Sequence, residues 1–160
     1  MIKGRKERGR SVHYIKNDQL FSIMKFYSRK WIKPEDLNSN GTIFGGSVLS
    51  WVDEEAAIFT ACQLNTSQIV TKYMSEINFV NTARQGDILE IGMEPVKFGR
   101  TSITIRCEVR NKFTKAPIVT IERIVFVNVD ENGRSKPHGI THTPELEEAQ
   151  KSRAQEASAS

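Results

Sequence analysis

The chain has 160 residues, of which 38% are hydrophobic and 26% charged, and these values predict one globular domain with a buried core. No stretch approaches the roughly 20 apolar residues that a membrane-spanning helix needs, which excludes a membrane span. The net charge of +4 says little about the folded part, because the first ten residues alone supply that charge through five basic residues and Glu7. A nucleic-acid-binding protein needs a basic patch on its folded face, so we expect no nucleic-acid partner.

The two ends of the chain and its cysteines bear on localisation and domain boundaries. The basic N-terminus lacks the apolar segment of a secretory signal peptide, and two cysteines are too few for a disulfide framework. We therefore expect a cytoplasmic protein. We place a basic N-terminal arm at 1–18, one folded domain at 19–140 and a polar C-terminal tail at 141–160. The first ten and roughly the last fifteen residues lack apolar periodicity, so we expect them to add little to the core.

The predicted elements begin with a weak strand over 21–32 and one long helix over 45–64. A helix of this length spans about 30 Å. Its apolar residues occupy nearly the whole circumference, and a helix that is apolar on most sides is typically buried.

Four strands follow the helix, over 69–80, 88–97, 100–110 and 117–129. The strongest signal is in the third, where four apolar residues alternate with polar ones, as in a half-buried strand. Phe98-Gly99 predicts a hairpin between the second and third strands. The fourth strand is β-branched on both faces, which predicts burial on two sides. The fold class is therefore α+β, with a curved antiparallel β-sheet wrapped around one long buried helix.

Several common catalytic motifs are missing from the sequence. The three histidines, His13, His138 and His142, lie outside the predicted core elements, and the chain has no nucleophile elbow, phosphate-binding loop or dinucleotide-binding motif. His138 and His142 have the spacing of metal ligands on a helix, but Gly139 and the surrounding loop residues argue against a helix there. We therefore predict no metal site and no cofactor.

Two glycines at the start of the helix, Gly45 and Gly46, form the first candidate site. A helix N-terminus carries free N–H groups and a partial positive charge, so it can bind an anion or a developing oxyanion. Glycine lets a ligand approach the backbone closely. The same glycines are equally suited to packing at the entrance of the helix, and the sequence leaves both interpretations open.

Asp53 is the second candidate, because a carboxylate in an apolar helix is costly unless it is paired, hydrogen-bonded or functional. It is either a general base in a cleft or one partner of a buried structural ion pair with a strand arginine. Asp53 follows Gly46 by seven residues, which corresponds to about 10 Å along the helix axis. One reacting carbonyl cannot touch both from the same helix, so a site that uses both requires two subunits whose helices run antiparallel.

The segment NSNGTIFGGSVLSWVDE, with QGDILE, KFGRTSI and VDENGRSKP further along, resembles the acyl-CoA thioesterases of the hotdog fold, in particular the short single-domain bacterial acyl-CoA hydrolases. The resemblance covers approximately residues 21–137. Its most specific part is N-G-x-I-F-G-G, followed seven residues later by Asp53. It implies a hotdog fold, hydrolysis of acyl-CoA to free fatty acid and CoA in fatty acid metabolism, and a homodimer with shared active sites, arranged as a hexameric trimer of dimers.

The resemblance also implies roles for individual residues. Asp53 is expected to activate water or to attack the thioester itself, while backbone N–H groups at Gly45 and Gly46 hold the thioester oxygen. Arg134 and Lys136 are expected to neutralise nucleotide phosphates. The implied site further includes the catalytic candidate Thr42 and the substrate-binding candidates Asn38, Asn40, Phe44, Asn78, Arg100, Thr101 and Ser102.

Other interpretations stand beside this one. Hotdog dehydratases and hydratases use a histidine near the helix entrance, and residues 14–137 contain no histidine. A non-catalytic acyl-CoA-binding or sensing module keeps Arg100 and the glycines but does not need Asp53. Glu54 and Glu55 stand where the small bacterial members often carry Met and Gly, which leaves the shape of the acyl pocket open.

Overall fold

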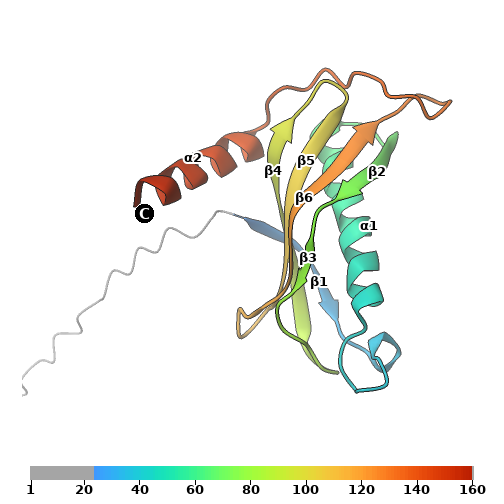
Figure 1. Ribbon diagram of the computed structural model, residues 1–160, viewed down its shortest axis with the longest axis vertical. Coiled ribbons are helices and arrows are strands. Elements are labelled where there is room, and N and C mark those ends of the chain that lie inside the picture. Colours follow the sequence, from blue (N-terminus) through green and yellow to red (C-terminus); the bar gives the residue numbers. More distant parts are fainter. Residues whose placement is uncertain (1–23, 160) are drawn as a thin grey trace, which may run out of the picture.

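One antiparallel sheet of six strands carries a helix on each of its faces (Figure 1). The computed structural model describes residues 24–159. The strand order is β1-β4-β5-β6-β2, and β3 also pairs with β6. Neither helix of the described residues is long and apolar enough to cross a membrane. The elements are β1 (Lys25–Trp31), the 3-10 helix η1 (Pro34–Asp36), α1 (Gly45–Leu64), β2 (Ile69–Met74), β3 (Ile77–Phe79), β4 (Ile88–Phe98), β5 (Ser102–Asn111), β6 (Pro117–Asn128) and α2 (Pro144–Ala159).

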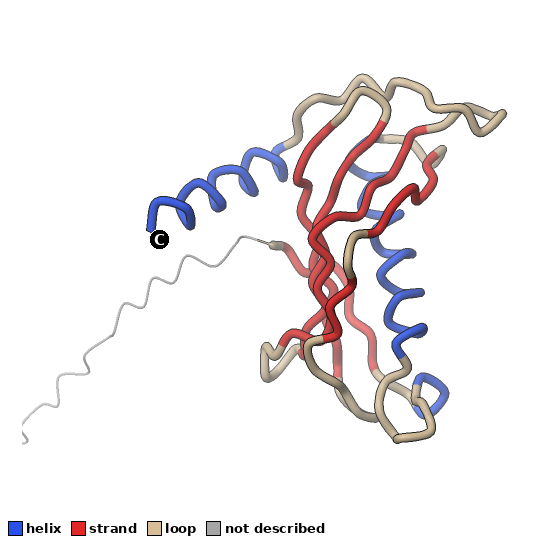
Figure 2. The backbone as a smooth tube through the Cα atoms, in the orientation of Figure 1, coloured by secondary structure: helices blue, strands red, loops and turns tan. Residues whose placement is uncertain are grey.

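The helix predicted over 45–64 is confirmed at both ends as α1, and it runs lengthwise along one face of the sheet (Figure 2). Val48, Val52 and Ala56 have no exposed surface, because they share the side of α1 that faces the sheet. The outer side of α1 is open, and Ile58 on it is 53% exposed. The expectation of burial on most sides is therefore wrong for the single chain, since no further layer of the described residues covers the outer side.

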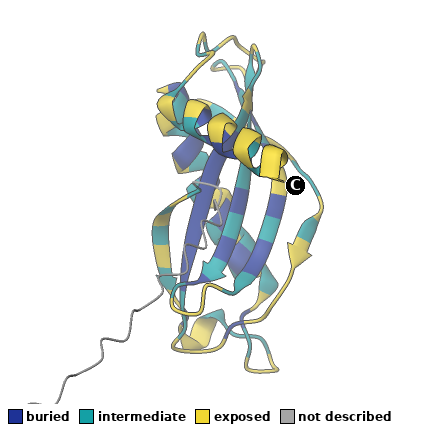
Figure 3. Cartoon of the chain, turned by 90° about the vertical axis from the view of Figure 1, so that its left-hand side faces the viewer, coloured by how far each residue is buried: buried dark blue, intermediate teal, exposed yellow. Residues whose placement is uncertain are grey.

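The alternation predicted for the third strand is confirmed in β5, whose apolar residues are all buried in the core. In β6 the expected burial on both faces is wrong, because buried positions mostly alternate with half-buried ones and Glu122 and Arg123 are exposed. The reason is that α2 crosses only part of the outer face of the sheet (Figure 3). Within residues 24–159, the part of that face formed by β5 and β6 therefore stays half-buried or exposed.

The segment predicted as one strand over 69–80 forms two short strands, β2 and β3. Ser75 interrupts the ladder: its N–H donates to the carbonyl of Arg123 at 2.8 Å, and its Oγ accepts from the N–H of Arg123 at 3.1 Å. Beyond β2 no further strand pairs within the described residues, so β2 is an edge strand with one open side.

The last residues form a helix that packs against β4, where the sequence indicates a polar tail that is helical at its start. Leu146 and Ala149 are buried, and Nη2 of Arg153 lies 3.2 Å from Oε1 of Glu94. The expectation that these residues add little to the core is corrected, because one side of α2 covers part of the outer face of the sheet. The basic arm expected over 1–18 lies outside the described residues, and the three domain boundaries stay predictions.

The outer face of the sheet carries a buried carboxylate, that of Glu90 in β4. This residue is 3% exposed, and its Oε1 accepts hydrogen bonds from Arg110 at 2.7 Å and from Lys115 at 2.8 Å. Lys112 lies 3.7 Å from its other oxygen. Burial by itself raises the pKa of Glu90, but the hydrogen bonds from Lys115 and Arg110 outweigh it and hold the pKa below its ordinary value. The charged cluster therefore ties β4 to β5 and to the turn after it.

Glu90→Gln removes the charge of this cluster and keeps its size. At pH 7 we expect the free energy of unfolding to fall by about 1–3 kcal/mol, because charge-assisted hydrogen bonds are lost. Since the pKa of Glu90 is lower in the folded than in the unfolded state, its stabilisation is present above the unfolded-state pKa and disappears as the pH falls through the folded-state pKa. The difference from wild type should therefore shrink in acid, as measured by urea unfolding at a fixed protein concentration.

Glu131→Gln, in the exposed turn after β6, is the matched control. It should change the free energy of unfolding by less than about 0.5 kcal/mol at either pH. An equal loss of stability for Glu90→Gln at neutral and acidic pH would show that Glu90 contributes packing and not charge.

Candidate active site

A tight loop over residues 37–44 leads into α1, and Asn38 organises it. The side-chain oxygen of Asn38 accepts hydrogen bonds from the N–H groups of Asn40 at 2.9 Å and Thr42 at 3.3 Å, and its amide N–H donates to Thr42 Oγ1 at 3.0 Å. Gly41 has φ +70°, a conformation that glycine adopts without strain. Three of the sequence-predicted site residues therefore shape the loop that determines where α1 begins.

Phe44 is the N-cap of α1, and its carbonyl accepts from the N–H groups of Ser47 at 3.0 Å and Val48 at 3.3 Å. The N–H groups of Gly45 and Gly46 come before these, and neither has an acceptor in the described part of the chain. Two free N–H groups at a helix N-terminus are suited to hold an anion or an oxyanion.

Two exposed aromatic rings lie against these glycines. A Cβ on Gly46 would lie 2.6 Å from the ring of Phe44, and one on Gly45 would lie 3.2 Å from the ring of Phe79. Both rings are more than half exposed, at 56% and 55%. Asn78, beside Phe79 in β3, is also exposed. The glycines therefore allow close packing at the helix entrance. Their free N–H groups also remain able to bind an anion or an oxyanion.

Asp53 lies about two turns further along α1, on an exposed side of the helix. Its Oδ1 accepts a hydrogen bond of 2.8 Å from Thr71 Oγ1 in the edge strand β2, and it pairs with no charged side chain of residues 24–159. The alternative of a buried ion pair with a strand arginine is therefore wrong for the single chain. Val70 and Tyr73, close to Thr71 in β2, are 46% and 48% exposed. The carboxylate thus stands beside the open edge of the sheet.

The β4–β5 turn contains Arg100 and Thr101. The segment that follows β6 contacts this turn and brings further predicted site residues near it. The chain after β6 returns to it: the N–H of Asn128 donates to the carbonyl of Thr101 at 2.8 Å, and the N–H of Lys136 donates to the carbonyl of Asn128 at 2.8 Å. The structure thereby brings Lys136 next to the segment that is expected to line the substrate groove.

His138 also contacts the β4–β5 turn, a contact that the sequence did not predict. Its Nε2 lies 3.1 Å from the carbonyl oxygen of Ser102, its N–H donates to the carbonyl of Arg100 at 3.3 Å, and its ring meets Phe98 edge-on. His138 is half-buried, although it lies outside the elements that the sequence predicts for the core. No spacing rule indicates a contact between residues this far apart in the chain. Arg134 lies nearby in sequence but in an exposed turn.

Most of the predicted site residues lie near the two opposite ends of the sheet within one subunit. The loop over 37–44 and β3 lie toward one end of the sheet, and the β4–β5 turn lies at the other (Figure 2). Asp53 comes between them on α1, whose 20 residues span about 30 Å. The single chain therefore does not assemble the predicted residues into one site.

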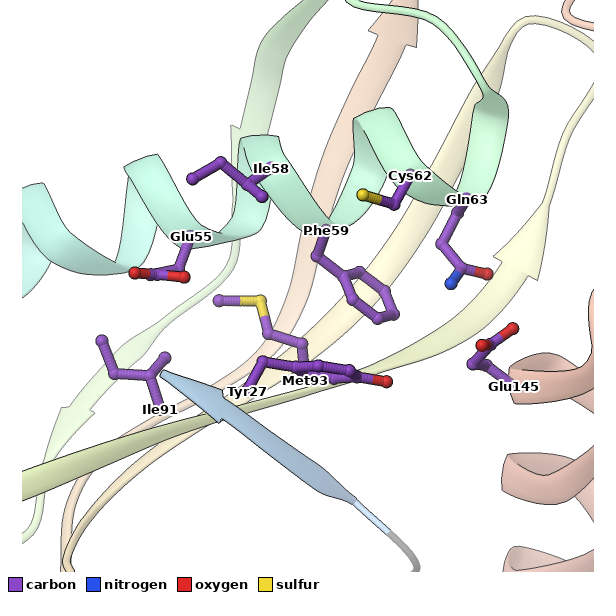
Figure 4. A pocket seen from close by; sticks show the side chains of 9 residues that line it. All are labelled: Tyr27, Glu55, Ile58, Phe59, Cys62, Gln63, Ile91, Met93 and Glu145. Carbon is purple, nitrogen blue, oxygen red and sulfur yellow. The ribbon is translucent and has the colours of Figure 1, made fainter. Parts of the chain in front are cut away.

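A separate pocket of about 170 Å³ opens between α1, β1, β4 and the start of α2 (Figure 4). Its lining is mostly apolar, and Glu55 and Glu145 add two carboxylates. Glu55 comes two residues after Asp53, about 200° around the helix, so the pocket and Asp53 lie on different sides of α1. The lining residues are Tyr27, Glu55, Ile58, Phe59, Cys62, Gln63, Ile91, Met93 and Glu145.

The buried cysteine, Cys107, is no candidate nucleophile. Burial raises the pKa of Cys107 to about 12, and the thiol form does not attack a thioester. Across residues 24–159, no three His, Cys, Asp or Glu side chains are grouped so as to hold a metal ion. The absence of a metal and of a cofactor stays a prediction.

Comparison with known proteins relates the chain to one family. Residues 40–116 match the family model described as Thioesterase superfamily. An uncharacterized acyl-CoA thioester hydrolase of Haemophilus influenzae is 37% identical over 122 residues, which cover 72% of this chain and 79% of that protein. The acyl-CoA thioester hydrolase YciA of Salmonella typhimurium is 34% identical over 110 residues, which cover 65% of this chain and 82% of that protein.

Solved structures have the same fold. An aspartate-to-alanine mutant of HI0827, a hexameric broad-specificity acyl-coenzyme A thioesterase, matches with a TM-score of 0.71 at 29% identity, covering 82% of this chain and 99% of that chain. The hexameric thioesterase y2039 of Yersinia pestis matches with a TM-score of 0.66 at 28% identity, covering 71% of this chain and 94% of that chain. The chain therefore belongs to the thioesterase superfamily, among the acyl-CoA thioester hydrolases of the hotdog fold.

Proposed function

We propose that this protein hydrolyses acyl-CoA thioesters with Asp53 of one subunit and the helix N-terminus at Gly45 and Gly46 of the partner subunit. One observation carries the proposal: α1 holds an exposed carboxylate beside the open edge strand, in a chain whose relatives are named acyl-CoA thioester hydrolases. Asp53 buries no apolar surface in the core, so packing of the single chain does not account for it.

The distance between the two parts of the site supports a dimer. Asp53 and Gly46 are about 10 Å apart along α1, which is too far for one carbonyl group to contact both. Two copies that pair antiparallel along β2 continue the sheet and set their α1 helices side by side in opposite directions. This arrangement brings Gly46 of the partner subunit toward Asp53. The hexameric state of HI0827 and y2039 supports a trimer of such dimers.

Asp53 acts on the thioester in one of two ways. As a general base, the carboxylate takes a proton from water while the water oxygen attacks the carbonyl carbon. As a nucleophile, a carboxylate oxygen attacks that carbon and forms an anhydride, which water then hydrolyses. In both routes the carbonyl oxygen becomes negative and accepts hydrogen bonds from the N–H groups of Gly45 and Gly46 of the partner subunit. Collapse of this oxyanion breaks the C–S bond, and the CoA thiolate that leaves takes up a proton. The acyl group is released as a free carboxylate, in the nucleophilic route only after water has hydrolysed the anhydride.

Cations near the β4–β5 end of the sheet hold the nucleotide of CoA. Arg100, Arg134 and Lys136 are exposed and can each neutralise a phosphate oxygen. Thr101 and Ser102 line the groove beside them. In the antiparallel dimer this end of one subunit lies toward the α1 entrance of the other, so a single CoA molecule extends from one cluster to the other.

The α1 entrance receives the reacting end of the substrate. Asn38 and Asn40 shape the loop there, and the hydroxyl of Thr42 lies 3.2 Å from the side-chain oxygen of Asn38. Phe44 borders Gly46 and is placed to face the substrate, and Asn78, beside Phe79 in β3, stays a substrate-binding candidate. Thr42 stays a catalytic candidate, since its loop leads directly to the free N–H groups.

An acyl-CoA-binding or sensing module that performs no chemistry is the alternative. A module of this kind gains nothing from Asp53, because an exposed carboxylate repels the phosphates of an anionic ligand. A thiol-release assay over acyl-CoA lengths from acetyl to palmitoyl separates the two functions. Binding without thiol release at any chain length would establish the module.

Asp53→Asn keeps the shape of the side chain and removes the base. We expect kcat to fall on the order of 10²–10⁴-fold with little change in KM, because the lost group acts on the transition state more than on bound substrate. Thiol release measures the rate, and circular dichroism confirms that the variant is folded.

Glu54→Gln is the matched control, since Glu54 is the next residue of α1 and is also exposed. It should keep kcat within about twofold of wild type. A folded Asp53→Asn variant with full activity would show that Asp53 is not the catalytic carboxylate, and a loss of kcat in Glu54→Gln would then identify Glu54 instead.

Complementation between two inactive variants tests whether the site is shared. Subunits with Asp53→Asn are mixed, by unfolding and refolding together, with subunits carrying Gly46→Pro. The proline removes one of the two N–H groups and is tolerated in the first helical turn, but its Cβ displaces the exposed ring of Phe44, so circular dichroism first confirms that this variant is folded. A mixed dimer contains one intact site, so random mixing should restore about a quarter of the wild-type activity. Mixed dimers, verified by differential tags, that stay inactive would place both groups in the same chain.

Light scattering tests the assembly itself. At micromolar concentration we expect twice or six times the mass of one chain, because the open edge of β2 and the exposed side of α1 favour pairing. A monomeric mass together with full thioesterase activity would contradict the shared site.

A further inference from the structure

Residues 129–143 connect β6 to α2 without forming a helix or a strand, and they carry two of the cations proposed to hold the nucleotide, Arg134 and Lys136. Connections of this length without secondary structure are usually either functional or disordered, and this one is ordered by hydrogen bonds. The N–H of Asp130 donates to the carbonyl of Arg134 at 2.8 Å, and the carbonyl of Lys136 accepts from the side-chain amide of Asn128 at 2.9 Å. The end of β6 therefore determines the course of the segment as far as Lys136.

His138 fixes the next part of the segment to the β4–β5 turn and the start of β5. Its backbone N–H donates to the carbonyl of Arg100 at 3.3 Å. The N–H of Ile140 donates to its Nδ1 at 3.1 Å, so the ring hydrogen is on Nε2, which donates to the carbonyl of Ser102 at 3.1 Å. One imidazole thus joins two backbone segments that are more than thirty residues apart in the sequence.

The surroundings of His138 hold its ring in this position. Gly139 has φ +75°, which turns the chain back so that the N–H of Ile140 reaches the ring. Ile140 is partly buried against the core, and the ring of Phe98 meets the imidazole edge-on, with centroids 6.2 Å apart. His138 is half-buried, whereas Lys136 two residues before it is exposed. The contact therefore determines where Lys136 lies relative to Arg100.

The three cations of this region have no acidic partner among the described residues. Arg100, Arg134 and Lys136 are exposed, and none of them pairs with a carboxylate of residues 24–159. Like charges that are held in one region repel one another, and a ligand with several phosphates relieves that repulsion. The nucleotide part of CoA is a ligand of this kind.

We propose that His138 is a positioning residue for recognition of the CoA nucleotide, an inference that rests on the proposed function. It holds the segment that carries Arg134 and Lys136 against the turn that carries Arg100, so that the cations are in place before the substrate arrives. Cations that are already ordered lose less conformational freedom on binding. His138 touches neither the phosphates nor the reacting carbonyl in this role and acts only through the segment.

Two substitutions separate the hydrogen bonds of His138 from the volume of its ring. His138→Phe keeps a flat ring against Phe98 and removes both ring hydrogen bonds. His138→Gln keeps an N–H donor that can reach the carbonyl of Ser102. His142→Phe is the matched control, because the same substitution four residues later affects a ring that is 58% exposed and pairs only with Glu147 in α2.

Steady-state thiol release in the full-length protein compares two substrates with the same acyl group, an acyl-CoA and the corresponding acyl-pantetheine, which lacks the nucleotide. We expect His138→Phe to raise KM for acyl-CoA roughly tenfold, about the effect of one hydrogen bond to a charged group, with kcat within about twofold. On acyl-pantetheine its kcat/KM should stay within about twofold of wild type. His138→Gln should keep KM for acyl-CoA within about threefold, and His142→Phe should match wild type.

Calorimetry with CoA itself measures the same effect without turnover, and His138→Phe should weaken the Kd of CoA roughly tenfold. An unchanged KM and Kd, an equal loss on both substrates, a loss confined to kcat, or equal kcat/KM of wild type on both substrates would each overturn the inference. Absence of thiol release from wild type, together with weaker CoA binding by His138→Phe, would overturn the proposed hydrolysis and support the role of His138.

Discussion

Burial of one side of α1 against the sheet is the interaction on which the rest of the structure depends. Val48, Val52 and Ala56 lose all contact with water there, and burial of such apolar side chains is the main stabilising term in folding. Because the helix is held along its whole length, both regions of the proposed site that lie on it are held with it. The glycines are fixed near one end of the sheet, and Asp53 is fixed beside β2.

The same packing leaves the outer side of α1 and the open edge of β2 uncovered. Val70 and Tyr73 are exposed along β2, next to unpaired backbone groups, and Ile58 is exposed on α1. An isolated chain gains nothing from this surface, whereas a second copy paired along β2, as proposed above, would cover the edge and extend the sheet. In the proposed dimer this contact also completes the active site, so assembly and catalysis share one physical cause.

Periodicity in the sequence predicted the secondary structure where each element is decided locally. The helix over 45–64 and the alternation in β5 followed from repeats of about 3.6 and two residues along their own segments. The break at Ser75 and the packing of α2 did not follow, because they depend on Arg123 and on Glu94, which lie far away in the chain. The one-sided exposure of α1 was missed for the same reason, since the pattern shows how apolar a face is but not what covers it.

For the site, the sequence by itself determined the chemical groups: the carboxylate of Asp53, two glycines at a helix entrance, and a separation along one helix that prevents a single chain from using both on one carbonyl. Only the tertiary structure decided that Asp53 is exposed and bound to Thr71, and that His138 meets Ser102 at the far end of the sheet. The physical reason is that periodicity assigns a side chain to a face of its own element. Which element packs on that face is decided by the competition of all apolar surfaces of the chain for burial.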